Sequence, residues 1–334
     1  MRSRAHSSAG FSLIELMVAV AVMGIVTAQL FVVFANQKKV FTSNDRALDA
    51  QESARLTLDL ISFDTRMAGF MVPKYTAVSS VDGGAANADR YCASAPGSAG
   101  SGGTVPTKIS RFQGATLVNN ITATSVTVNT ADLDMDGDGL ADFVVNSGVI
   151  VASETRTYCA RIASLNPNGA TTDIVFATNA AAGEDATFYL GGTTPSSDMR
   201  AVPANVYEID TQALQLRRNN LLLASQIEDF EVEFWLDTAG SPNGVEDGPN
   251  EFPVNDLNNP DPPATGPGSI PAANDEVRRV RISVTARTTL EDQESSATGN
   301  LQWGRPALAN HAAGAVVDRF RRRTFSASIL PRNI

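Results

Sequence analysis

One apolar run near the start of the chain constrains its fold more than any other feature. Residues 11–35 read FSLIELMVAVAVMGIVTAQLFVVFA, contain no proline and carry one ionisable side chain, Glu15. As a helix, this run extends about 37 Å, enough to cross the hydrocarbon core of a bilayer, which is about 30 Å thick. A carboxylate at that depth is disfavoured by about 2–4 kcal/mol. Glu15 therefore either stays near an interface or has a partner.

Two ordinary explanations leave part of this run unexplained. A secretory signal has a shorter apolar core and a small-x-small cleavage site, whereas this run is followed by Asn36, Gln37 and two lysines. A plain signal anchor explains the length, but neither Glu15 nor the polar leader that ends in Gly10. Positive charge does not decide the orientation, because two arginines precede the run and two lysines follow it.

The start of the chain resembles a known processing signal. Gly10 followed by FSLIEL, with Glu15 five residues on, resembles the class III signal of type IV prepilins and pseudopilins. In that family a membrane peptidase cuts after the glycine and methylates the new N-terminal residue. The resemblance implies a cut between Gly10 and Phe11. It also implies that Glu15 pairs with the amine of a neighbouring subunit in the filament, which makes both charges tolerable and fixes the axial register.

The apolar run continues into an amphipathic segment. Apolar residues recur there at spacings of three and four: Ala47, Ala50, Ala54, Leu58 and Ile61. This spacing predicts a helix with one face on a core. We expect four more residues to widen that face: Leu56, Leu60, Phe63 and Met67. One helix is therefore expected from about residue 11 to 68, ending at Gly69, with Pro73 preventing its return.

Beyond residue 70 the pattern becomes typical of β-strands. The clearest strand is 277–289, where Val280, Ile282 and Val284 alternate with polar residues. A hairpin is expected over 214–224, with its turn at Asn219-Asn220. Further strands are expected at 123–130, 142–162 (one long strand or two), 173–178, 186–192, 205–210, 230–238 and 323–330. Residues 240–274, rich in Pro, Asn and Asp, are expected to form a surface loop.

These patterns predict an α+β chain with a long N-terminal helix packed on an antiparallel β-sheet head. This arrangement agrees with the type IV pilin fold that the resemblance implies. The implied organisation is a leader at 1–10, a transmembrane and filament-core helix at 11–39, an amphipathic half at 40–70 and a β-rich head at 71–334. Loss of the leader removes two arginines and changes the net charge from −10 to −12. This acidic balance argues against a nucleic-acid surface.

Motifs in the head narrow the resemblance to the PilW family of minor pilins. They are ESARLTLDLISFDTRMAGF, LLLASQIEDFEVEFWLD followed by VRRVRISVTART, and RRRTFSASILPRN. The resemblance covers residues 1–70 and about 200–334, and leaves 75–200 without an interpretation. It implies a structural subunit that primes a type IV pilus and sits at its tip, in twitching motility and adhesion. Implied partners are other minor pilins, the major pilin, a PilY-type adhesin and the prepilin peptidase. The implied location is the inner membrane, with the head in the periplasm, and later the pilus tip.

Two alternatives stay open on the sequence. J-type pseudopilins of type II secretion are similar to PilW-type pilins. A membrane-anchored periplasmic enzyme would need a catalytic constellation. His311 is the one histidine outside the leader, and no nucleophile-elbow pattern or zinc-type spacing accompanies it. The sequence therefore predicts that the chain is not an enzyme.

The two cysteines are Cys92 and Cys159. In an oxidising periplasm they can form a disulfide, and no other cysteine competes. Two free buried thiols are the alternative.

An acidic loop inside the uninterpreted region predicts a structural calcium ion. ADLDMDGDGLADFVV places carboxylates in the pattern D-x-D-x-D-G-x-x-D, at Asp134, Asp136, Asp138 and Asp142. Gly139 permits a sharp turn and the Leu140 carbonyl can add an oxygen, so that several oxygens can converge on one ion. The match to an EF-hand is partial, because Val145 stands where that loop has glutamate. An acidic turn with solvated charges is the alternative.

The arginine-rich end, DRFRRRTF, contains Arg319, Arg321, Arg322 and Arg323. It shows no aromatic stacking pattern of the kind that binds single-stranded nucleic acid. We therefore expect a solvated edge strand protected from aggregation by its charge, and no specific nucleic-acid contact.

Overall fold

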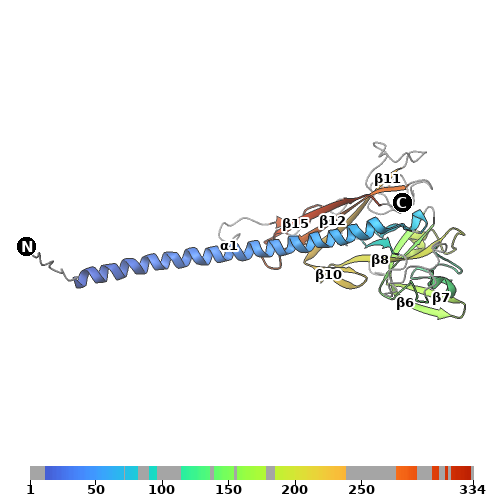
Figure 1. Ribbon diagram of the computed structural model, residues 1–334, viewed down its shortest axis with the longest axis horizontal. Helices are drawn as coiled ribbons and strands as arrows, with labels where there is room; N and C mark the ends of the chain where they lie inside the picture. Colours follow the sequence, from blue (N-terminus) through green and yellow to red (C-terminus); the bar gives the residue numbers. More distant parts are fainter. Residues whose placement is uncertain are drawn as a thin grey trace, which may run out of the picture.

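The computed structural model shows one long helix and a β-rich head (Figure 1). Helix α1 runs from Leu13 to Met67 over 55 residues. One half of α1 projects away from the head, and the other half lies against it (Figure 1). The predicted α+β class, with a long helix on an antiparallel head, is confirmed. The structure describes residues 12–70, 72–81, 90–95, 114–135, 139–153, 156–177, 185–237, 276–291, 303–307, 313–314 and 317–331.

Local side chains and one glycine set the ends of α1. The Ser12 hydroxyl accepts the backbone N–H of Ile14 at 3.4 Å, and the Glu15 carboxylate accepts the N–H of Ser12 at 3.0 Å. This capping box satisfies two donors that a helix start leaves without intrahelical partners. The helix ends at Met67, and Gly69 follows with φ +80°, a conformation that favours glycine. The prediction that the helix stops at Gly69 is confirmed.

The larger sheet of the head has ten strands, all paired antiparallel. Its order is β1-β2-β8-β5-β6-β7-β4, with β3 and β9 also paired to β8 and β10 paired to β9. The strands are β1 (Val78–Val81), β2 (Arg90–Ser94), β3 (Ala115–Thr116), β4 (Ser125–Asn129), β5 (Gly148–Ala152), β6 (Thr157–Asn168), β7 (Thr171–Ala177), β8 (Arg200–Asp210), β9 (Gln215–Arg218) and β10 (Leu221–Ser225).

A smaller sheet covers the other side of the helix. It is antiparallel with the order β11-β12-β15, formed by Ile227–Asp237, Glu276–Arg287 and Arg322–Ile329. A two-stranded pair, β13 (Trp303–Gly304) with β14 (Val317–Asp318), forms a third sheet. In Figure 1, β12 and β15 flank α1 on one side, and β8 and β10 flank it on the other. The two sheets therefore meet the same buried face of α1 from two sides and leave its opposite face exposed.

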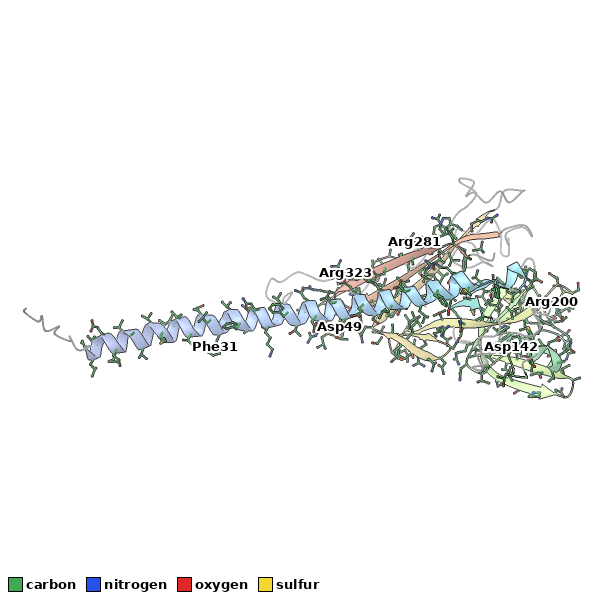
Figure 2. The ribbon with its side chains drawn as sticks, viewed as in Figure 1. Phe31, Asp49, Asp142, Arg200, Arg281 and Arg323 are labelled. Atoms are coloured by element: carbon green, nitrogen blue, oxygen red, sulfur yellow. A yellow bond between two sulfur atoms is a disulfide. The ribbon has the colours of Figure 1, made fainter. Side chains whose placement is uncertain are left out.

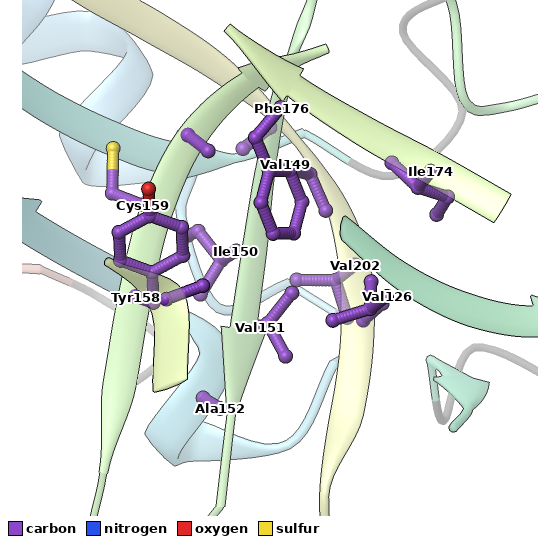
Figure 3. Packing of buried hydrophobic residues seen from close by; sticks show 14 of the residues in the cluster. Val126, Val149, Ile150, Val151, Ala152, Tyr158, Cys159, Ile174, Phe176 and Val202 are labelled. Carbon is purple, nitrogen blue, oxygen red and sulfur yellow. The ribbon is translucent and has the colours of Figure 1, made fainter. Parts of the chain in front are cut away.

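The head contains two apolar cores. In the core around α1, Ala54, Leu58 and Ile61 of the helix pack with Phe230 and Phe234 of β11. The second core lies among the strands of the larger sheet, away from the helix. Figure 3 shows part of it, including Val126, Val149, Ile150, Val151, Tyr158, Ile174, Phe176 and Val202.

A disulfide joins Cys92 of β2 to Cys159 of β6, with their Cα atoms 5.7 Å apart. This pairing confirms the prediction. Two strands, β8 and β5, separate β2 from β6 in the order of the sheet, yet β2 and β6 are in contact. The larger sheet is therefore curled, and the disulfide crosses its interior.

One predicted strand is a helix. Residues 186–192 were expected to be extended, but α2 occupies Ala186–Leu190. The Asp185 carboxylate accepts the N–H of Thr187 at 2.8 Å and caps the helix, and Gly191 at φ +79° ends it. The strand prediction is therefore wrong here, because the capping residues on either side decide the local structure.

Most other strand predictions are confirmed. The expected runs at 123–130, 173–178, 205–210, 230–238, 277–289 and 323–330 correspond to β4, β7, β8, β11, β12 and β15. The stretch 142–162 contains two strands, β5 and β6. Asn219 and Asn220 form the turn between β9 and β10, with φ of +51° and +63° as a two-residue hairpin requires. The expected loop at 240–274 lies outside the described residues.

The prediction that Leu56, Phe63 and Met67 widen the buried face of the helix is wrong. These three side chains are 62 %, 61 % and 49 % exposed, whereas Ala54 and Ile61 are fully buried. Leu60 is half-buried. The reason is geometric, because the sheets cover one face of α1 and the three exposed side chains project from the opposite face.

A buried polar cluster ties the helix to the larger sheet. One carboxylate oxygen of Asp64 accepts hydrogen bonds from Asn205 Nδ2 at 2.9 Å, from the Tyr207 hydroxyl at 2.5 Å and from Arg218 Nε at 2.9 Å. Burial, and then the charge of Asp64, raise the pKa of the Tyr207 hydroxyl above its usual value. Tyr207 therefore stays protonated and donates. Next to this cluster, the hydroxyls of Thr65 and Tyr91 are 2.9 Å apart.

We predict that the disulfide contributes substantially to the stability of the head. It closes a loop with a sequence separation of 67, which in the chain-entropy treatment is worth about 4 kcal/mol. Cys92→Ala with Cys159→Ala should lower the free energy of unfolding by about that amount in denaturant titrations. Reductant should produce a similar loss in the wild type and none in the double variant. Equal sensitivity of both proteins to reductant would contradict this assignment.

We predict that Asp64→Ala lowers the free energy of unfolding by about 2–4 kcal/mol, because Arg218 and two neutral donors lose a shared acceptor. Asp59 is the matched control, since it is an exposed aspartate on the same helix. Asp59→Ala should change the stability by less than about 0.5 kcal/mol. The check is urea unfolding of the detergent-solubilised chain followed by circular dichroism. Similar stabilities for the two variants would show that the cluster does not hold the helix to the sheet.

Candidate functional site

The projecting half of α1 exposes apolar side chains all around its circumference. Its large apolar residues between Leu13 and Phe34 are 49–77 % exposed, and Phe31 marks this half in Figure 2. By length and composition the helix can cross a membrane, and none of its most apolar window is buried. A helix that is apolar on every side is stable when lipid or other helices surround it.

Glu15 lies in a shallow apolar groove of this half. The groove is lined by Ile14, Glu15, Val18, Ala19, Val22, Met23 and Val26. These residues are spaced three and four apart, so they share one face of the helix. Glu15 is the one ionisable side chain between residues 12 and 37. A groove of this kind can accept an apolar ridge of another helix while the carboxylate meets a cation.

The structure adds a role for Glu15 that the sequence analysis missed. Its carboxylate accepts the N–H of Ser12 and so caps its own helix. The S-x-x-E spacing at residues 12–15 was the signal that could have revealed this capping box. The predicted processing residues Gly10 and Phe11 lie outside the described residues. Ser12 is the residue directly after Phe11, so the Glu15 carboxylate is held next to the predicted cleavage point.

The exposed face of α1 in the head half carries a second apolar surface, which we call the outer stripe. It consists of Leu48, Leu56, Phe63 and Met67, each about half exposed or more. At about 100° per residue, these side chains fall within one arc of about 100° on the helix. The outer stripe lies opposite the buried face of α1. The exposed acids Glu52 and Asp59 fall within the same arc, so the outer stripe is a row of apolar side chains interrupted by charges.

The structure describes part of the predicted calcium loop. Asp134 Oδ2 accepts the N–H of Gly139 at 3.0 Å, and Gly139 has φ +89°. Asp142 is buried, and its Oδ2 accepts the N–H of Met135 at 2.7 Å. Asp136 and Asp138 lie outside the described residues, and Leu140 is exposed. Within the described ranges, which omit 136–138, no three side chains of metal-binding type form a group. Calcium binding therefore stays a prediction.

One of the terminal arginines is structural. Arg322 opens β15 and donates hydrogen bonds to Glu228 on β11 and to both carboxylate oxygens of Asp318, at 2.6 and 2.7 Å. The hydrogen bonds to Asp318, and then those to Glu228, raise the pKa of its guanidinium. Its side chain is 6 % exposed. As predicted, β15 is an edge strand and Arg323 is exposed, but the prediction of a solvated side chain is wrong for Arg322.

Comparison with known proteins supports the interpretation of the N-terminus. The family described as "Prokaryotic N-terminal methylation motif" matches residues 5–28. Comparisons with curated proteins and with solved structures gave no match. The matched segment contains the predicted cleavage point, Glu15 and the start of the exposed apolar helix. The chain thus carries a prepilin-type leader and an apolar N-terminal helix, which together support a type IV pilin or pseudopilin anchored in a membrane before assembly.

Proposed function

We propose that this chain is a structural minor pilin of the PilW type, which primes assembly of a type IV pilus and stays at its tip. The observation that carries the proposal is the methylation motif at residues 5–28. It stands at the start of a helix whose apolar half is exposed on all sides and which continues without a break into the head. The same helix can serve as a membrane anchor first and as part of a filament core later.

The apolar half of α1 explains how one segment can serve in both settings. Lipid tails surround it before assembly, and helices of neighbouring subunits replace them in the filament. Both surroundings are apolar, so burial of apolar surface alone does not specify which subunits pair or in which axial register. The pairing of Glu15 with the amine of a neighbour's Phe11 would specify the partner and the register, because an unpaired charge in the filament core is costly. Cleavage by a prepilin peptidase creates the amine.

The outer stripe supports a role in which the head half of α1 also contacts other subunits. We propose that other minor pilins and the major pilin pack along α1, and that a PilY-type adhesin binds the tip. The adhesin and the tip position rest on the PilW resemblance of the head. Twitching motility and adhesion would follow from the pilus as a whole, and the chain itself would have no enzymatic role.

A J-type pseudopilin of type II secretion is the competing assignment, since the methylation motif is shared by pilins and pseudopilins. Deletion of the gene distinguishes the two. Loss of surface pili and twitching with normal secretion supports the minor pilin. Loss of secretion with normal piliation supports the pseudopilin.

We predict that Glu15→Ala is still cleaved before Phe11 and inserted into the membrane, because the change makes the helix more apolar. Incorporation into filaments should fall at least tenfold, because the neighbour's amine loses its partner. Mass spectrometry of membranes reports processing, and immunoblots of sheared pili report incorporation.

The matched control is Asp49→Ala, which removes an exposed acid from the head half of the same helix (Figure 2). It should be processed and incorporated as in the wild type. Normal incorporation of the Glu15 variant, or an equal defect in the control, would contradict the pairing role.

We also propose that the acidic loop at 134–142 binds a structural calcium ion. Two features support it: the bond from Gly139 to Asp134, which closes the loop, and the buried carboxylate of Asp142 at its end. Asp134, Asp136, Asp138, Asp142 and the carbonyl of Leu140 would supply the oxygens. The ion would fix the chain between β4 and β5.

We predict that calcium raises the melting temperature of the chain relative to chelator. Binding to the native state alone contributes about 2.7 kcal/mol at a hundredfold excess over Kd. Asp134→Ala with Asp138→Ala should abolish the difference, whereas Asp132→Ala, just outside the motif, should retain it. Equal melting temperatures of the wild type with calcium and with chelator, together with no heat of binding, would leave the loop as an acidic turn.

A further inference from the structure

A basic cleft lies where α1 passes from its apolar half to the head. The cleft has a volume of about 370 Å³, and its walls come from α1, from the chain just after β12 and from Arg321 just before β15. Its charged side chains are Lys38, Lys39, Arg46, Arg321 and Glu291. Four cations and one anion give a charge of +3, in a chain whose net charge is −10. The cleft therefore concentrates positive charge in a chain that is negatively charged overall.

The wall opposite α1 is held by hydrogen bonds within the chain. The N–H of Thr288 donates to the Arg321 carbonyl at 2.9 Å, and the N–H of Arg321 lies 3.3 Å from Thr288 Oγ1. Thr288 Oγ1 donates to the Leu290 carbonyl at 2.9 Å. Thr288 is itself buried. These bonds join the end of β12 to the start of β15, so that Arg321 and Glu291 stand on a fixed wall.

The position of the cleft along α1 relates it to the membrane surface. If the hydrocarbon core begins near Leu13, about 30 Å of helix brings its far edge to about residue 33. Lys38 and Lys39 then lie about 8 Å beyond that edge, at the level of the lipid headgroups. In Figure 2, Arg323 lies at the end of the small sheet that is nearer to the apolar half of α1. Arg321, which directly precedes β15, lines the same cleft as Lys38 and Lys39.

We propose that this cleft binds the phosphate of a membrane phospholipid headgroup while the chain is anchored in the bilayer. The inference rests on the membrane anchoring that is part of the proposed function. Ammonium and guanidinium groups on two facing walls can surround a phosphodiester, with Lys38 and Lys39 on α1 and Arg321 opposite. Ala35 and Leu290 provide apolar contact beside them. A bound headgroup would fix the height of the head above the membrane until the subunit is extracted.

Lipid is favoured over a protein segment by the position of the cleft. Headgroups surround the anchor at this level on every side, so an acidic peptide would first have to displace them. Glu291 limits the negative charge that the cleft accepts, which suits a singly charged phosphodiester. Removing that carboxylate should therefore strengthen binding, whereas removing the lysines should weaken it.

The test uses the full mature chain in a neutral detergent, titrated with short-chain phosphatidylglycerol and followed by calorimetry. Short-chain diacylglycerol, which lacks the phosphate, and inorganic phosphate are the comparison ligands. We expect saturable binding of the phospholipid that weakens with salt, and little binding of the other two. Lys38→Gln with Lys39→Gln should weaken binding about tenfold or more. Arg321→Gln should weaken it severalfold, and Glu291→Gln should strengthen it.

The control is Arg66→Gln, which removes an exposed arginine from the last turn of α1, far from the cleft. It should leave the affinity unchanged. Equal weakening by the control and the lysine variant, or binding of diacylglycerol as tight as that of the phospholipid, would overturn the proposal. So would binding of inorganic phosphate as tight as that of the phospholipid, or binding of an acidic peptide in place of the lipid. Pilus incorporation is measured separately in cells, so phospholipid binding by a chain that enters no filament would refute only the pilin assignment.

Discussion

The exposed apolar half of α1 is the constraint on which the rest of the structure depends. Nothing in the described head covers it, and water cannot surround it without a large cost in free energy. Lipid or neighbouring helices must therefore surround it, and both settings need a smooth helix without breaks. The polar side chain of Thr27 meets this need by donating to the Met23 carbonyl, 2.7 Å away within the helix. The head is confined to the other half of α1, where the two sheets leave the apolar half free.

Because one helix serves the anchor and the head, the position of the head follows that of the anchor. Two features make this connection firm. Asp64 joins α1 to β8 and β9 through three donors, and the small sheet packs on the buried face around Ile61. The disulfide acts farther away, inside the curled sheet. A displacement of the helix along its axis would therefore carry the adjoining sheets with it, as insertion of a subunit into a filament requires.

The sequence predicts the general fold because strong periodic signals define its main elements. The apolar run, the spacing of Ala54, Leu58 and Ile61, and the alternation in β12 each specify a local structure that tertiary contacts reinforce. The errors have identifiable causes. Residues 186–190 form a helix and not the expected strand, because Asp185 caps its start and Gly191 ends it. Arg322 is bonded to Glu228 on β11 and to Asp318, contacts that no local sequence pattern reveals. Leu56 and Phe63 were assigned to the core because apolar character does not show which face of a helix the sheets cover. For the same reason, the sequence could not reveal the outer stripe or the basic cleft, which depend on how distant segments meet.

Glu15 shows how a costly charge can be tolerated in stages. In the structure its carboxylate accepts the N–H of Ser12 at the start of α1, where the helix dipole also favours a negative charge. Its own helix therefore supplies a local donor and lowers the cost of keeping it in the membrane before assembly. This capping interaction is weak and exposed, so a stronger partner can replace it. A protonated amine created beside it by cleavage, or brought by a neighbouring subunit, is such a partner. The local cap and the proposed pairing in the filament are thus two states of the same carboxylate, and the difference in their strength favours the assembled state.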